Sequence, residues 1–162
     1  MTTKEYNKSI ALWSDDAYRF ALRLCDDVEA GKDAVQEALM ALWQRCREVD
    51  FNKAKPFLLS TVYHKTMDYH RRHYREHQAR GDLATEPVST PHGEEHYSDP
   101  VERALRTLPA VQRAVLELAD VEGYTYKEIA AALTLSDQQV RVYLYRARVA
   151  LKKRLIEYGY NQ

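Results

Sequence analysis

Glycine, proline and cysteine are all scarce in this sequence, and each shortage narrows the possible structures. There are five glycines, five prolines and two cysteines among 162 residues. Ala, Leu, Glu, Lys and Arg, which favour helices, are abundant. Together with the small number of helix-breaking glycines and prolines, they indicate a helical protein rather than a sheet or a disordered chain. The sequence contains no run of about eighteen apolar residues, which a membrane-spanning helix would need. The segment MTTKEYNKSI lacks the apolar stretch of a signal peptide. We therefore expect an all-α, soluble, cytoplasmic protein.

Residues that could perform catalysis or bind a metal are also scarce. Cys25 and Cys46 form no Cys-x-x-Cys pair and lie among apolar neighbours, which indicates reduced core thiols rather than a disulfide. His73 and His77 stand four residues apart, but no cysteine or third fixed ligand accompanies them. There is no glycine-rich phosphate loop and no nucleophile elbow. The sequence therefore predicts a protein that is not an enzyme and that needs no metal or cofactor.

The absence of net charge conceals an uneven distribution along the chain. Lysine plus arginine and aspartate plus glutamate each number 24. Residues 81–100 carry five acidic side chains and no lysine or arginine, whereas residues 136–162 carry six basic and two acidic ones. The helix macrodipole accounts for cations in the last turn of a helix, but not for Arg141 near the beginning of this one.

Residues 81–98 are predicted to be an acidic linker between two small helical domains. The segment from Gly81 to Pro100 has three of the five prolines, two glycines and no periodic apolar pattern. We therefore assign residues 1–80 to an N-terminal domain and residues 99–162 to a C-terminal domain. No internal repeat relates the two domains.

Three helices are predicted in the N-terminal domain, as in a three- to four-helix bundle. Apolar residues at helical spacing mark a helix over residues 6–24, and Gly31 is expected to break the chain after it. An acidic cap followed by a glutamine opens a second helix over residues 33–49. A proline suits the first turn of a third helix over residues 56–75.

The C-terminal domain has clear helix starts and ends. Proline follows Asp99 and Leu108, where each dipeptide resembles a helix start, and Gly123 is expected to end the second helix. Capping boxes at Thr125–Glu128 and Ser136–Gln139 open two more helices, which are separated by a very short break. Two helices joined in this way form a helix-turn-helix.

The last helix has an apolar stripe and a cationic surface. One side is apolar and should pack on the other helices. This side comprises Val140, Leu144, Ala147, Leu151 and Leu155. The other sides present groups that can hydrogen-bond to base edges, contact a thymine methyl or neutralise phosphates in a DNA major groove. The residues predicted to bind duplex DNA are Ser136, Gln138, Gln139, Arg141, Val142, Tyr145, Arg146, Arg148 and Lys152.

The second and third helices present two further surfaces. On the second helix Met40 stands amid amides and acids, opposite the apolar stripe, and its flexible thioether suits a protein contact. The third helix interleaves basic and aromatic residues, a composition typical of binding to single-stranded DNA. We expect Phe57 and Tyr69 to be buried, and Tyr63 and His64 to face DNA.

Two sets of motifs resemble the extracytoplasmic-function, or group IV, sigma factors of bacterial RNA polymerase. Resemblance to the promoter-binding region 4 rests on Leu108-Pro109, Arg113-Ala-Val-Leu116, Tyr124-Thr-Tyr-Lys-Glu-Ile-Ala130 and Tyr145-Arg-Ala-Arg148. Resemblance to region 2 rests on Asp33-Ala-Val-Gln-Glu37, Leu42-Trp43, Phe57-Leu58, Asp68-Tyr69 and Arg71-Arg72. Together the motifs cover roughly three quarters of the chain, in the family's order and with a linker between them.

The resemblance implies a transcription initiation factor with no catalytic activity of its own. Such a protein binds the polymerase core at the clamp helices of the largest subunit and at the flap. It recognises the −35 and −10 promoter elements, helps to separate the strands, and is often held inactive by an anti-sigma factor; the free protein should be a monomer. The core contact is assigned by resemblance to Asp33, Gln36, Glu37 and Met40. The −10 and melting contacts are assigned to Phe51, Asn52, Lys53, Lys55, Tyr63, His64, Arg71, Arg72 and Arg75.

Three positions depart from the family's pattern. Phe57 stands where the family commonly has tryptophan, and His64 stands where it commonly has asparagine, so the details of −10 recognition should differ. Thr134 replaces the usual glycine between the two helices of the helix-turn-helix. Because a left-handed backbone is costly for a β-branched residue, we expect a turn of slightly different shape.

Two other classes of protein could share some of these features. A homodimeric helix-turn-helix regulator with an N-terminal sensing unit would bind a palindrome without polymerase, at half-sites about one helical turn apart. The basic aromatic third helix favours the sigma factor, since a sensing unit does not need it. A recombinase would instead place paired carboxylates, or a nucleophilic serine or tyrosine, against DNA, which motifs alone do not decide.

Overall fold

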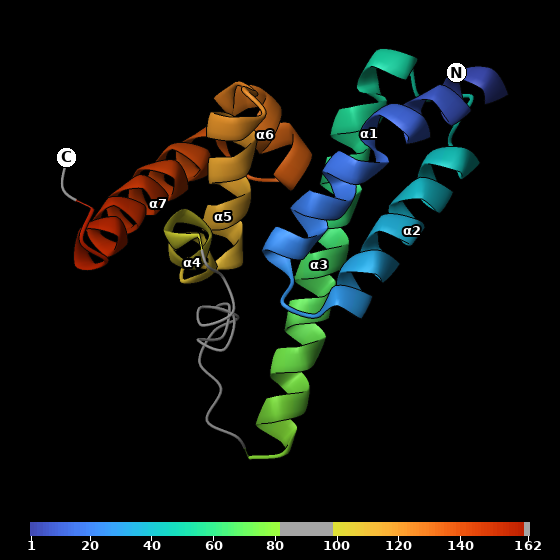
Figure 1. Cartoon of the computed structure of the whole chain (residues 1–162). Coiled ribbons are helices and arrows are strands. Elements are labelled where there is room, and N and C mark those ends of the chain that lie inside the picture. The colour runs from blue at the N-terminus through green and yellow to red at the C-terminus, as the bar shows by residue number, and fades with distance from the viewer. Residues whose placement is uncertain (82–98, 161–162) are drawn as a thin grey trace. The chain divides into compact units, whose positions relative to one another are not determined.

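The computed structural model describes residues 1–81 and 99–160, and every regular element in these two ranges is helical (Figure 1). The chain divides into two compact units, Met1–His70 and Arg71–Gln162. The predicted linker, residues 81–98, lies outside the described residues except for Gly81. The all-α prediction is confirmed. Among the described helices, none combines the length and the apolar character that crossing a bilayer requires.

The first unit contains α1 (Thr3–Leu24), α2 (Val28–Gln44), the short 3-10 helix η1 (Phe51–Lys53) and the start of α3 (Ala54–Ala79). α1 and α2 lie side by side (Figure 1) and bury small and apolar side chains against each other. The core of this unit comprises Ala17, Phe20, Ala21 and Leu24 of α1, Ala34, Val35, Ala38 and Leu42 of α2, and Leu58, Leu59, Val62 and Tyr63 of α3.

The start of α2 differs from the prediction. Asp27 caps this helix, because its Oδ1 accepts hydrogen bonds from Glu29 N at 2.9 Å and Ala30 N at 3.4 Å. Gly31 is buried inside the helix, where a Cβ atom would lie 3.1 Å from Leu22 Cδ2 of α1. The expectations that Gly31 breaks the chain and that the helix begins at residue 33 are therefore wrong. Glycine allows α1 to approach closely at this position, and the chain does not turn there.

The other boundaries in this unit move by a few residues. α1 begins at Thr3, where Thr2 Oγ1 accepts from Glu5 N at 3.1 Å and Glu5 Oε2 accepts from Thr2 N at 2.7 Å. α2 ends at Gln44 rather than near residue 49. α3 begins two residues before Pro56, which lies in its first turn as expected.

The second unit contains α4 (Pro100–Arg106), α5 (Ala110–Leu116), a π-helical turn η3 (Glu117–Val121), α6 (Tyr126–Leu133) and α7 (Asp137–Glu157). The predicted helix starts are confirmed. Asp99 Oδ1 accepts from Val101 N at 3.0 Å, α5 begins directly after Pro109, and both capping boxes are formed. Gly123 has a φ of +74°, a backbone conformation that ends the helix before it.

The apolar stripe of α7 holds this unit together. Val140, Leu144 and Ala147 are buried against the other helices, and Leu151 and Leu155 are half-buried. The turn between α6 and α7 contains Thr134, whose φ of 56° and ψ of 49° are left-handed. Thr134 therefore adopts the conformation expected of glycine, and the expected change in shape is not seen at this residue.

Candidate polymerase and nucleic-acid interfaces

The outward surface of α7 is accessible to a partner. All the residues predicted to bind duplex DNA are exposed, and Tyr145 has 70% of its surface open to solvent. At the beginning of the helix the surface forms a hollow of about 250 Å³. Its lining comprises Ser136, Gln138, Gln139, Val142, Tyr143 and Arg146. Four of the polar groups expected to reach base edges or phosphates therefore gather around one recess.

Two of these residues also form the cap of α7. Ser136 Oγ accepts a hydrogen bond from Gln139 N at 3.0 Å, and Gln139 Oε1 accepts one from Ser136 N at 2.9 Å. These bonds satisfy backbone donors that a helix beginning otherwise leaves open. They also fix the position and orientation of the Gln139 amide at the helix end.

Two of the exposed arginines of α7, Arg141 and Arg148, are held by neighbours from the same unit. The guanidinium of Arg141 lies over the ring of Tyr126, 5.7 Å from its centroid. Arg148 donates from Nη2 to Asp120 Oδ1 at 2.6 Å and from Nε to Asp120 Oδ2 at 3.2 Å. The hydrogen bonds that Arg148 donates to Asp120 raise the pKa of Arg148 above its usual value, so the guanidinium stays charged. This pair is not predictable from local sequence patterns, because its members are 28 residues apart.

The segment before α3 combines exposed and restrained side chains. Asn52 and Lys53 are exposed, as expected of residues that bind a single DNA strand. Phe51 is half-buried, with its ring 5.1 Å from that of Trp13, and Lys55 Nζ lies 3.2 Å from Asp16 Oδ2. Both restraints come from α1, which sequence reasoning did not include in the site.

The prediction that Tyr63 faces DNA is wrong. Tyr63 is only 6% exposed and belongs to the core of the first unit, whereas Phe57 and Tyr69, which were expected in the core, are half-buried. Successive residues on a helix are rotated by about 100°, so a small error in the assigned rotation exchanges a buried ring for an exposed one. His64, the other residue expected to face DNA, is half-buried, with its ring 5.2 Å from that of Tyr63.

The later part of α3 is strongly cationic. Exposed side chains are expected of residues that bind the phosphates of a DNA strand. The three predicted arginines here are all exposed: Arg71, Arg72 and Arg75. His73 Nε2 and His77 Nε2 lie 2.9 Å apart. Within the residues that the structure describes, no group of three or more His, Cys, Asp or Glu side chains could hold a metal ion.

The predicted protein-binding surface of α2 is exposed. Asp33, Gln36 and Glu37 face solvent, and Met40 is 60% exposed. Trp43, one turn beyond Met40, is 50% exposed although its ring lies 4.9 Å from that of Tyr6. Sequence reasoning did not include Trp43 in this surface. Its spacing of three residues from Met40 was the available signal, since residues so spaced share a helix face.

Comparison with known protein families accounts for both units. Residues 10–76 match the family described as Sigma-70 region 2, and residues 98–151 match Sigma-70, region 4. The chain is 32% identical over 163 residues to the ECF RNA polymerase sigma factor SigL of Mycobacterium tuberculosis, covering 92% of this chain and 89% of the relative. It is 27% identical over 145 residues to the ECF RNA polymerase sigma factor SigM of Bacillus subtilis, covering 87% and 89%.

A solved structure shares the fold. The sigma factor RpoE of Bartonella quintana, crystallised in complex with the anti-sigma factor NepR, superposes with a TM-score of 0.76 at 24% identity, covering 94% of this chain and 98% of that one. The chain belongs to the extracytoplasmic-function family of RNA polymerase sigma factors. It is an alternative sigma factor, which directs RNA polymerase to promoters. The match of residues 10–76 to region 2 replaces the interpretation of this part as a sensing unit.

Proposed function

We propose that the two units perform different parts of promoter recognition. Residues 1–80 would act as the region 2 domain, residues 81–98 as the linker and residues 99–162 as the region 4 domain. The observation that carries this proposal is the exposure of two chemically distinct surfaces, one apolar and acidic on α2 and one cationic on α7. An exposed Met40 suits a protein partner, whereas a row of arginines suits DNA.

The α7 surface is proposed to read the −35 element as duplex DNA. Gln138, Gln139 and Arg141 lie at the leading end of the helix, which is the part that enters the major groove in a helix-turn-helix. Val142 would contact a thymine methyl, and Arg146 and Lys152 would neutralise phosphates. Arg148 contributes positive charge, while Asp120 engages two of its three nitrogens.

The segment before α3 and the cationic side of α3 are proposed to bind the −10 element as separated strands. The half-buried Phe51 and His64 offer rings for base stacking, and the exposed Asn52 offers hydrogen bonds. The contacts to phosphates would come from Lys53, Lys55, Arg71, Arg72 and Arg75. Tyr63 is left out of this surface, because it is buried.

The polymerase contact is proposed to lie on α2. Asp33, Gln36, Glu37 and Met40 would dock on the clamp helices of the largest subunit, with Trp43 at the edge of the contact and region 4 on the flap. Aromatic residues and methionine are enriched at the centres of such interfaces. The protein would work in the cytoplasm as a monomer until it meets the core, without catalysing a reaction itself. An anti-sigma factor, such as the NepR that accompanies the Bartonella RpoE, would hold it inactive.

Two weak DNA contacts produce strong binding when the polymerase core holds both of them at the correct separation. The free chain should therefore bind promoter DNA poorly, and the holoenzyme should bind it well. The test is to mix the purified chain with polymerase core, follow co-elution, and sequence the transcripts that the mixture initiates. If the chain does not co-elute and the transcripts are the same without it, the proposal is wrong. A palindromic footprint by the free chain would support the homodimeric regulator instead.

A further inference from the structure

The segment Phe51–Lys55 is anchored to α1 at both ends. At its first residue, the centroid of the Phe51 ring lies 5.1 Å from that of the Trp13 ring. Lys8 Nζ, also from α1, lies 5.3 Å from the centroid of the Phe51 ring. At its last residue, Lys55 Nζ lies 3.2 Å from Asp16 Oδ2. Between these anchors, Asn52 and Lys53 are exposed. The two ends are fixed and Ala54 is buried, so Asn52 and Lys53 are the residues presented to solvent.

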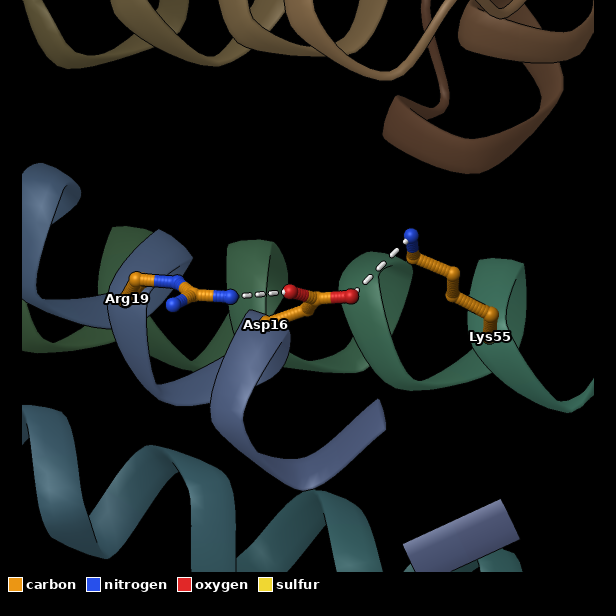
Figure 2. Close-up of polar contacts among 3 residues, drawn as sticks. All are labelled: Asp16, Arg19 and Lys55. Carbon is orange, nitrogen blue, oxygen red and sulfur yellow. Dashed lines mark hydrogen bonds and ion pairs between the residues drawn. The ribbon is translucent and has the colours of Figure 1, made fainter. Parts of the chain in front are cut away.

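Asp16 binds two cations at once, as Figure 2 shows. One oxygen faces Arg19, one turn further along α1, and the other faces Lys55 at the beginning of α3. The side chains of Asp16 and Lys55 are 28% and 23% exposed, so both are partly removed from water. The hydrogen bond from Arg19, followed by the contacts with Lys55, holds the pKa of Asp16 below its usual range, and the carboxylate stays ionised at neutral pH.

We propose that Trp13 and Asp16 are positioning residues that hold the segment Phe51–Lys55 in the shape it presents to the separated −10 strand. The inference rests on the function proposed for this segment. Binding a flexible segment costs conformational entropy, and a segment already ordered in the free protein avoids that cost. α1 itself need not touch DNA, because it acts through Phe51 and Lys55.

The first measurement concerns the free, full-length chain. Hydrogen exchange at the backbone amides of Lys53 and Ala54 reports the order of the segment directly, because Lys53 N donates to Asp50 O at 2.9 Å and Ala54 N donates to Phe51 O. Trp13→Ala and Asp16→Asn should each speed this exchange, while Trp13→Phe, which keeps a ring beside Phe51, should restore most of the protection. Amides of α7 serve as the internal control and should be unaffected.

The second measurement concerns the holoenzyme and a fork-shaped promoter DNA with a single-stranded −10 element, taken from a mapped transcript. Asp16→Asn should weaken binding about two- to fivefold, in the range of partly exposed ion pairs. Trp13→Ala should weaken it about two- to tenfold, in the range of an aromatic pair. Glu48→Gln is the matched control, since it removes one acid from an exposed pair with Arg45 in the same unit. In a Lys55→Ala background, Asp16→Asn should have no further effect.

The outcomes separate the inference from the proposed function. Unchanged amide exchange in both variants overturns the inference, whatever the DNA result. Faster exchange with unchanged strand binding overturns the role proposed for Phe51–Lys55, and the inference falls with it. Stronger strand binding by Asp16→Asn would show that this carboxylate merely repels phosphates, and would also overturn the inference. Faster exchange, weaker strand binding and loss of the Asp16 effect without Lys55 together support it.

Discussion

Arg148 and Asp120 form a bidentate ion pair that joins α7 to the turn after α5, with the shorter contact at 2.6 Å. Under the proposed −35 contact, an Arg148 released from this pair would be available to DNA phosphates. Its side chains are 52% and 40% exposed, so it adds only a little to stability, of the order of 0–1 kcal/mol. Its larger effect is on where the guanidinium points.

Replacing Asp120 by asparagine should release Arg148 toward DNA. One additional phosphate contact would steepen the decrease of binding with salt by about one unit of the log–log slope. The measurement is the salt dependence of holoenzyme binding to a −35 duplex. Glu157→Gln is the matched control, because it removes an exposed acid paired with Arg154 in the same unit. Equal slopes for the two variants would contradict the prediction.

Arg141 and Lys152 should differ in the kind of DNA contact they make. Arg141→Ala should change which −35 bases are preferred and cost about 1–3 kcal/mol at the base it reads, whereas Lys152→Ala should weaken all sequences alike. Binding of the holoenzyme to a panel of −35 variants measures both effects. A uniform loss of affinity across the panel for Arg141→Ala would exclude a base-reading role.

Met40→Asp should weaken the contact with polymerase core while leaving the fold intact. Met40 is 60% exposed, so an acid at this position should cost little folding stability in the free protein. A charge buried in a docked apolar contact should weaken the binding free energy for core by about 1–2 kcal/mol or more. Leu12→Asp is a suitable control, since Leu12 is a 51% exposed apolar residue of α1 outside this surface. If both variants keep full affinity for core in a titration, Met40 lies outside the interface.

Thr134→Gly should stabilise the second unit. Threonine at a φ of 56° is strained by about 1–2 kcal/mol. Glycine removes that strain but loses more entropy on folding, so the net gain should be about 0.5–1 kcal/mol. Urea denaturation followed by hydrogen exchange of α6 and α7 amides measures the change within this unit. A loss of protection would mean that the threonine side chain itself supports the turn.

Tyr69 should make the stability of the first unit sensitive to alkaline pH. Burial, with the charges of Cys25 and Asp27 nearby, raises the pKa of Tyr69 to about 12. The unfolded chain ionises near the ordinary value of about 10. The contribution of neutral Tyr69 to stability is therefore complete below about pH 10 and is lost as the pH rises through about 12. Tyr69→Phe should remove this dependence in denaturation curves, and identical curves for the two proteins would refute the prediction.

Local chemistry made much of the fold predictable. The caps at Asp99, Thr125 and Ser136 need only residues within one helical turn, and the structure contains all three. The apolar stripe of α7 follows from helical period alone, and its first three members are buried. These features depend on neighbours in sequence, so sequence patterns reveal them.

Features that depend on distant parts of the chain were not predictable in the same way. A glycine that ends a helix and a glycine that admits a second helix look alike in sequence, and Gly31 proved to be the latter. Tyr63 was misassigned because α3 carries aromatic residues on several sides, and packing decides which ring is buried. The restraints on Phe51, Lys55 and Arg148 come from residues 28 to 43 positions away.

The cap of α7 has a consequence for the bases that a promoter can carry. The oxygen of the Gln139 amide already accepts a hydrogen bond from Ser136 N with one of its two lone pairs, so the two amide N–H donors are the groups that remain wholly available to DNA. Bidentate recognition of adenine uses a donor and an acceptor from the same amide, whereas guanine and thymine can be contacted through acceptors alone in the major groove. Under the proposed −35 contact, the bond that begins the helix therefore favours guanine or thymine over adenine at the promoter position that Gln139 meets.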